Sequence, residues 1–424
     1  MPAVLQKKTT EKISTVAAVG RKSASWKAFA AILFQALIVL IAGILAIELA
    51  FGLAGIWEQD HLIPNREIGI SIMPNRKITF RNEGFSRRTF NSFGMANREI
   101  SEKKPANTFR IAVVGDSMIE ALQVDLSKTM CSRLEQQLND IDSVQGKKVE
   151  VLNFGVSASN VGQSYLRLKK LALRFQPDLV IMYVRDHATS DLPLPLNARF
   201  PFAARPHFFV ANNGAVYESR LLFDSWWNSK EARNLRAAQW LRMHSHVWSC
   251  LVNMQFRLVT GMEQLKAEAV SKTKGLISVL SLSKPDTPTE NSAEKAAAAA
   301  AADPNSELNK NIAIEQIKCV RHYFAVMERL LAAMKQECAK NNCKFAVVYI
   351  GATDNAGLEE HKLLRESMAK KNIPLMDFTD EFQTEKKKRP LYFVDPGHFN
   401  IAGNQLFADL IGSYLVSNKQ FLLK

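Results

Sequence analysis

The chain has 424 residues, of which 47% are hydrophobic, and a formal net charge of +14 at pH 7. This length suits one large domain or two ordinary ones, and the hydrophobic fraction is that of a globular protein. The positive charge would suit nucleic acid, but no nucleic-acid-binding motif accompanies it, so nucleic acid is not expected as a partner. An anionic lipid surface or polymer fits better, beside the alternative of a basic surface with no dedicated partner. No CxxC pair or His/Cys cluster predicts a metal site, and no cofactor is expected.

The N-terminus combines a basic tail with a long apolar run. Residues 1–27 hold six lysines and arginines against one glutamate, and residues 28–47 are apolar except for Gln35. Such a run is long enough to cross a bilayer, and the preceding positive charge favours a cytoplasmic N-terminus. The sequence therefore predicts a signal anchor over 28–56 and an extracytoplasmic remainder. A cleaved signal peptide and a buried core helix are the competing interpretations, but the run is long for the first and its basic flank disfavours the second.

Residues 57–108 show little periodicity and are interpreted as a membrane-proximal entry segment. Strands and helices then alternate, with strands predicted at 109–114, 149–154 and 178–184 and helices at 117–138 and 163–174. The third strand has the near-continuous apolar run of a buried parallel strand. This alternation predicts an α/β fold with a doubly wound parallel sheet.

Residues 192–311 interrupt the alternation as a largely helical insertion. A helical pattern covers about 230–270, and residues 283–307 have the alanine- and proline-rich composition of a linker. The aromatic side chains of the insertion fit a lid over a site, a surface that contacts the bilayer, or ordinary core. The tryptophans concerned are Trp226, Trp227, Trp240 and Trp248.

The alternation resumes at about residue 312 with an amphipathic helix that reaches Cys338. A strand at 344–350, a helix at 358–371, a short strand at 374–378 and a last helix at 401–416 follow, with Asn400 as the expected cap of that helix. Cys338 and Cys343 lie close in sequence. An exported location permits a disulfide between them, and two small buried side chains are the alternative.

Two short motifs carry the chemistry of a serine nucleophile and its base. Gly115-Asp116-Ser117 follows an apolar strand, and Asp395 precedes His398 by three residues. An aspartate in this position can accept the imidazole Nδ1 hydrogen, which leaves Nε2 free to take a proton from a serine. Both motifs follow or adjoin strands of one parallel sheet, so they are expected at one edge. The alternatives are a helix cap for Ser117 and a core role for His398.

These residues resemble the SGNH, or GDSL, hydrolase superfamily. The resemblance rests on Gly115-Asp116-Ser117, on Asn153-Phe154-Gly155-Val156-Ser157, and on residues 395–403, and it covers 109–191 and 312–424. It implies a three-layer flavodoxin-like fold, with Ser117 as nucleophile, His398 as base and Asp395 as the carboxylate that orients it. The backbone N–H groups of Ser117 and Gly155 would be oxyanion donors.

The third block of the family normally supplies an asparagine, and this chain has none there. In its place it reads Tyr183-Val184-Arg185-Asp186-His187, continuing to Asp191. His187 aligns best with the missing position, and Arg185 is the second candidate. A neutral histidine can donate one hydrogen bond, and loss of an oxyanion donor typically slows an enzyme about 100- to 1,000-fold. The alternative is that His187 only caps the strand loop.

Together these features predict a membrane-anchored serine esterase that acts on an acylated cell-envelope glycan or lipid. Transfer of the acyl group to a sugar hydroxyl would use the same triad. A non-catalytic envelope binding or scaffold protein is the alternative from another class, supported by the missing asparagine and opposed by the intact Ser117, Asp395 and His398.

Overall fold

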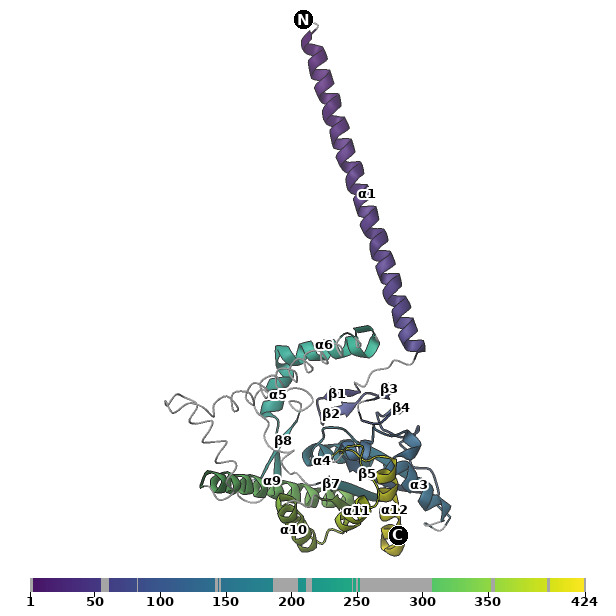
Figure 1. The fold of residues 1–424 in the computed structure, drawn as a ribbon, viewed down its shortest axis with the longest axis vertical. Helices are drawn as coiled ribbons and strands as arrows, with labels where there is room; N and C mark the ends of the chain where they lie inside the picture. Colours follow the sequence, from purple (N-terminus) through teal and green to yellow (C-terminus); the bar gives the residue numbers. More distant parts are fainter. Residues whose placement is uncertain are drawn as a thin grey trace, which may run out of the picture.

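The computed structural model contains a long N-terminal helix above an α/β domain (Figure 1). It describes the chain except for residues 1–2, 55–60, 82, 142–143, 145, 186–204, 211–215, 246, 249–250, 252–306, 352–354, 395–396 and 423–424. Helix α1 (Ala3–Leu53) is continuous, and within the described residues its part Trp26–Leu53 is the segment long and apolar enough to cross a membrane. This agrees with the expected position of the span and leaves its orientation a prediction.

The centre of the domain is a five-stranded parallel sheet in the order β11-β10-β7-β5-β6. Numbered along the chain, this is the 2-1-3-4-5 order of a flavodoxin-like sheet, whose direction of winding reverses between β5 and β7. The prediction of a doubly wound α/β fold is confirmed. The strands are β5 (Thr108–Gly115), β6 (Lys148–Gly155), β7 (Leu179–Arg185), β10 (Lys344–Ile350) and β11 (Leu375–Asp377).

Helices cover both faces of the sheet, which explains why its strands are almost continuously apolar. Ile111 and Val113 face one core and Ala112 and Val114 face the other, because successive side chains of a strand point to opposite sides. The first core is closed by α3 (Met130–Asp140), α11 (Thr379–Lys386) and α12 (Ile401–Ser417). The second is closed by α4 (Val161–Lys170), α9 (Glu307–Lys340) and α10 (Asn355–Lys370).

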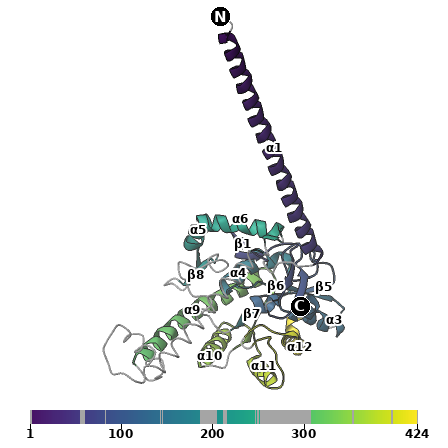
Figure 2. The ribbon, with the colours of Figure 1, turned by 45° about the horizontal axis from the view of Figure 1, so that its top comes forward.

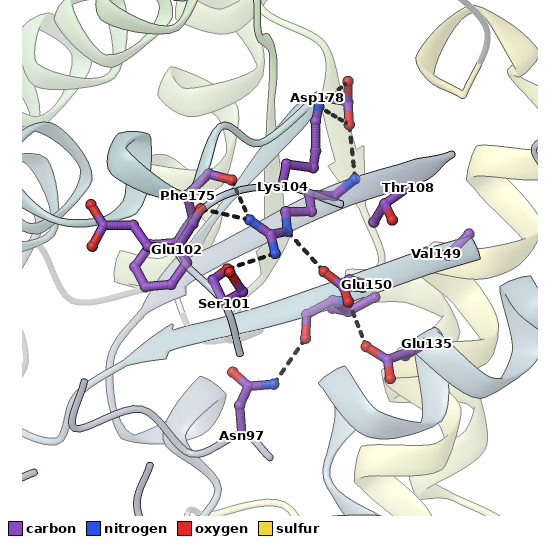
Figure 3. Close-up of polar contacts among 12 residues, drawn as sticks. Asn97, Ser101, Glu102, Lys104, Thr108, Glu135, Val149, Glu150, Phe175 and Asp178 are labelled. Atoms are coloured by element: carbon purple, nitrogen blue, oxygen red, sulfur yellow. Dashed lines mark hydrogen bonds and ion pairs between the residues drawn. The ribbon is translucent and has the colours of Figure 1, made fainter. Parts of the chain in front are cut away.

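A buried polar cluster holds together the amino-terminal ends of the strands. The fully buried guanidinium of Arg110 donates from Nε to Glu150 at 2.8 Å and reaches the Phe175 carbonyl oxygen at 2.8 Å. Asp178 accepts the Arg110 backbone N–H and the Lys104 ammonium at 2.8 and 2.9 Å (Figure 3). These charges are paired and hydrogen-bonded, as buried charges require. The opposite, carboxyl-terminal edge is where a doubly wound sheet places its site.

The entry segment contains structure that the sequence did not reveal. It forms two antiparallel hairpins, β1 (Leu62–Asn65) with β2 (Gly69–Ile72) and β3 (Lys77–Phe80) with β4 (Ser86–Thr89). Their apolar side chains form a third core with helix α5 (Leu221–Asn228) of the insertion. Of the three alternatives for the tryptophans, ordinary core fits Trp226 and Trp227, which pack against this core, and does not fit Trp240 and Trp248, which are exposed.

The insertion also contributes a hairpin of β8 (His207–Val210) and β9 (Val216–Ser219) and the helix α6 (Lys230–His244). The helix expected at 117–138 is interrupted. It consists of α2 (Ser117–Glu120), a turn of 3-10 helix at Leu126–Lys128, and α3, because Ala121 adopts a left-handed conformation with φ of 52°. Cys338 and Cys343 are both free and buried, so they take the second of the two expected roles.

Candidate active site

Ser117 lies where strand β5 gives way to the short helix α2. The capping residue is Asp116, whose Oδ1 accepts the backbone N–H of Met118 at 2.9 Å. Because Asp116 caps the helix, the Ser117 hydroxyl is not used for that purpose. The expected alternative role of Ser117 as helix cap is therefore wrong, and its hydroxyl is available at the carboxyl-terminal edge of the sheet.

His398 meets this hydroxyl from the other end of the domain. Its Nε2 lies 2.9 Å from Ser117 Oγ, although 281 positions separate the two residues. The loop that carries His398 is held by backbone bonds from Phe393 N to His398 O at 3.0 Å and from Asn400 N to Leu391 O at 2.9 Å. The structure thus brings together the expected serine and histidine.

The carboxylate beside His398 differs from the expected one. Glu83 Oε2 lies 2.5 Å from His398 Nδ1, and Glu83 Oε1 accepts the His398 backbone N–H at 3.3 Å. A carboxylate only accepts, so Nδ1 carries the proton and Nε2 is the basic nitrogen that faces Ser117. Asp395 lies outside the described residues, and the single Nδ1 hydrogen is already donated to Glu83. The sequence offered no signal for Glu83, which comes from the turn between β3 and β4, 315 positions before His398.

Two glycines allow the loops of Glu83 and His398 to approach. A Cβ on Gly397 would lie 2.2 Å from the Val394 carbonyl oxygen and 2.6 Å from Glu83 Oε1. Gly84 has φ of +76°, and a Cβ there would lie 2.5 Å from the Phe393 ring and 2.6 Å from the Gln123 carbonyl oxygen. Any larger side chain would therefore separate the two loops, and at Gly84 it would also strain the backbone.

Arg185 is the described residue of the third block that reaches the nucleophile's surroundings. Its Nη1 lies 3.9 Å from Asp116 Oδ2, and its side chain is 45% exposed. Burial raises the pKa of Asp116, while Arg185 and the Met118 N–H act in the opposite direction. A guanidinium therefore lies beside the residue that precedes Ser117. His187 lies outside the described residues, so its role stays a prediction.

The structure separates the two expected oxyanion donors, Ser117 and Gly155. Among the described residues, the Ser117 N–H donates to no acceptor. In contrast, the Gly155 N–H is donated to Asn153 Oδ1 at 2.9 Å, and Gly155 packs under α2, where a Cβ would lie 2.3 Å from Glu120 N. The expectation that Gly155 is a donor is therefore wrong. Ala158, three residues further and in a left-handed conformation with φ of 60°, has no recorded acceptor for its N–H among the described residues.

A buried pair beneath α2 supports the nucleophile's helix. Glu120 is fully buried, lies 2.6 Å from His61 Nε2, and accepts the Ser157 N–H at 2.5 Å. Burial alone would raise the pKa of Glu120, but the charge of His61 and the bonds from His61 and Ser157 hold it below its usual value. Arg88 of β4 adds bonds to the Glu120 and Ala121 carbonyl oxygens at 3.0 and 2.6 Å. These contacts fasten the two hairpins to the residues that follow Ser117.

Comparison with known proteins gives distant likenesses in structure. No family model and no curated protein matches the chain. The chain is similar to a lipase/acylhydrolase from Enterococcus faecalis at 12% identity, with a TM-score of 0.35, covering 73% of this chain and 96% of that one. It is also similar to the esterase EstA from Pseudoalteromonas sp. at 13% identity and a TM-score of 0.34, covering 73% and 97%. At such low identity and TM-score these likenesses carry no argument, so any activity must be inferred from the geometry of the site.

Proposed function

We propose that this chain is a serine esterase of the SGNH, or GDSL, hydrolase type that works through an acyl-enzyme. The observation that carries the proposal is the continuous relay from Ser117 Oγ to His398 Nε2 and from His398 Nδ1 to Glu83 Oε2. A protonated serine hydroxyl is a weak nucleophile. It becomes a strong one when an adjacent, oriented base takes its proton during the attack.

In the first half of the reaction, Ser117 Oγ attacks the ester carbonyl carbon while His398 Nε2 takes the hydroxyl proton. The imidazolium that forms is stabilised by the Glu83 carboxylate, which stays ionised. The negative charge on the carbonyl oxygen needs preorganised donors, for which the Ser117 N–H, the Ala158 N–H and the Arg185 guanidinium are the candidates. When the tetrahedral species collapses, the ester C–O bond breaks and Nε2–H protonates the departing alcohol.

In the second half, water replaces the alcohol. His398 Nε2 takes a proton from water as the water oxygen attacks the acyl carbon of the Ser117 ester. The bond between the acyl carbon and Ser117 Oγ then breaks, and Nε2 passes the proton to Oγ. The carboxylic acid leaves, and the hydroxyl and the neutral imidazole are restored. Each proton thus passes through one nitrogen, and Glu83 keeps the ring in the tautomer that both steps require.

We further propose that the substrate is an acylated glycan or lipid of the cell envelope. The candidate span Trp26–Leu53 follows a basic N-terminal tail, which favours a cytoplasmic N-terminus and an exported domain. The hairpin that carries Glu83 lies on the side of the domain nearest α1 (Figure 1). Next to Glu83, the exposed ring of Phe85 is flanked by the guanidinium groups of Arg81 and Arg87 at 5.9 and 5.8 Å. An apolar and cationic rim suits an amphipathic, anionic substrate.

The proposal is tested with purified full-length protein and short-chain nitrophenyl esters. Wild type is expected to hydrolyse acetyl ester, and Ser117→Ala to lose that activity while keeping its melting temperature. A folded wild type with no more activity than Ser117→Ala would overturn the esterase and favour a binding protein. The substrate class is then tested by comparing the content of acyl esters in the envelopes of cells that produce wild type and cells that produce Ser117→Ala. Acyl groups that appear on a new sugar hydroxyl only with wild type would indicate transfer instead of hydrolysis.

A further inference from the structure

We propose that helix α6 lies on the surface of the bilayer that α1 crosses and docks there on anionic lipid headgroups. This inference rests on the proposed membrane anchor and is independent of the chemistry of Ser117. It assigns one of the roles that the sequence allowed for the aromatic insertion, and it specifies which face contacts lipid.

Helix α6 has two distinct faces. Its inner face packs on the domain: Ala232 is fully buried, Gln239 Nε2 donates to the Leu62 carbonyl oxygen at 3.0 Å, and the Arg236 guanidinium lies 4.6 Å from the centre of the Trp227 ring. At 3.6 residues per turn, a second set of positions shares the outer face. All of these side chains are exposed, and they are Arg233, Ala237, Trp240, Leu241 and His244.

Large apolar side chains are exposed near the C-terminal end of α6, close to α1. Trp240 is 57% exposed, Leu241 is 41% exposed, and Trp248 just beyond the helix is 40% exposed. Tryptophan favours the headgroup level, where its ring is partly apolar and its N–H can be hydrated, and the cations Lys230 and Arg233 at the other end of the helix suit anionic lipid phosphates.

The position of α6 relative to α1 is fixed by a carboxylate near the end of the span. Glu48 Oε2 accepts bonds from Ser245 Oγ and from the Val247 backbone N–H, both at 3.0 Å. Ser245 is the residue that caps the C-terminus of α6. A carboxylate in a membrane span is costly unless it reaches polar partners, so this contact places the end of α6 at the boundary of the apolar layer.

The two helices also have the orientation that a surface helix needs. Helix α6 runs across the direction of α1, beside the foot of α1 and on the side of the domain from which α1 extends, in both views (Figures 1 and 2). Because its inner face contacts β1 of the domain, its outer face points to the side from which α1 arrives. A bilayer around α1 would therefore meet Trp240 and Leu241 first.

The test uses full-length protein in vesicles of phosphatidylcholine and phosphatidylglycerol that carry bromine on the upper part of the acyl chains. In a background with Trp26→Phe and Trp57→Phe, bromolipid should quench the tryptophan fluorescence. Trp240→Phe with Trp248→Phe should abolish this quenching, whereas the matched pair Trp226→Phe with Trp227→Phe, which removes partly buried rings, should retain it. Vesicles without phosphatidylglycerol should give weaker quenching.

A separate measurement tests whether α1 crosses the bilayer. A protein with an inserted span should remain in the vesicle pellet after an alkaline wash. Retention without quenching from Trp240 and Trp248 would overturn the surface role of α6 and leave the anchor intact. Loss of retention would overturn both. Nitrophenyl ester hydrolysis by each variant reports the proposed chemistry, and it should be unchanged. If the background protein, which keeps Trp240 and Trp248, shows no quenching, and Trp240→Phe with Trp248→Phe raises KM, α6 would instead be identified as a lid and the inference would be contradicted.

Discussion

Glu83 binds His398 through both carboxylate oxygens, one on the ring and one on the backbone N–H. This double contact fixes the ring orientation as well as the tautomer, and both are needed for Nε2 to point at Ser117. The carboxylate comes from a hairpin outside the parallel sheet, so the relay joins three separate parts of the chain.

Glu83→Gln should lower kcat for a nitrophenyl ester by about 100- to 10,000-fold, because an amide no longer stabilises the imidazolium and permits the wrong tautomer. Asp395→Asn is the matched control and should change kcat less than about threefold if Glu83 alone orients the ring. Stopped assays at several pH values measure both. A larger loss in Asp395→Asn than in Glu83→Gln would return the role to Asp395.

Arg185→Met should lower kcat about 100-fold if the guanidinium is an oxyanion donor, with a smaller change in KM. Arg185→Lys is expected to recover part of the loss, because it restores the charge beside Asp116 but not the planar group. His187→Ala, measured in the same assay, ranks the two candidates. A loss in His187→Ala with an unaffected Arg185→Met would assign the donor to His187.

The elements of the parallel sheet were predictable, and the hairpins beside it were not. Strand β10 was expected at its observed residues, because a buried parallel strand is a long apolar run. The strands of the two hairpins have four residues each, too few for a period of two to stand out, and their stability comes from packing against α5. The helix after Ser117 was expected to be continuous because the left-handed Ala121 has no signal in composition.

The same contrast holds within the site. Ser117 and His398 belong to motifs that stand next to regular elements, and their expected proximity is observed. Glu83 has no such motif, since only tertiary contacts bring its turn to the sheet edge. Gly155 was assigned from its place after a strand, but its N–H is used by a side chain two residues before it.

Gly397→Ala should reduce kcat up to about 100-fold, because the added methyl group would meet the Val394 carbonyl oxygen and Glu83 and so separate Glu83 from His398. Gly412→Ala is a suitable control, since the atoms nearest to its new methyl group belong to the flexible end of Gln137 and not to the backbone. Circular dichroism and ester hydrolysis are measured on both. Full activity in Gly397→Ala would show that the contact between the two loops is not required.

At the scale of the whole molecule, buried carboxylates tie its parts together and set its response to acid. The pKa of Glu120, Glu150 and Asp377 is lowered, because hydrogen bonds and nearby positive charges outweigh burial, which alone would raise it. Their basic partners are His61, Arg110 and the pair His361 and Arg365. In contrast to these three carboxylates, Asp116 has a raised pKa, because the effect of burial is the largest there.

The melting temperature should therefore fall as the pH drops below about 4.5. The three lowered carboxylates are ionised in both states above that pH, and below it the unfolded chain binds protons that the folded chain does not. Glu120→Gln should lower stability at pH 7 by about 1.5–3 kcal/mol and flatten the acid dependence. Thermal unfolding from pH 7 down to about pH 2.5 measures both, because the window lies between the unfolded pKa and the lower folded pKa. An acid dependence identical to that of wild type would contradict the role of Glu120.

The relay from Glu83 to Ser117 is tested most directly by a fluorophosphonate that forms an adduct with an activated serine. Full-length protein is labelled, digested and mapped by mass spectrometry. We predict one adduct, on Ser117, that forms much more slowly in Glu83→Gln and is absent in His398→Ala. A folded wild type that stays unlabelled, or that is labelled on another serine at the same rate in all three proteins, would contradict the account.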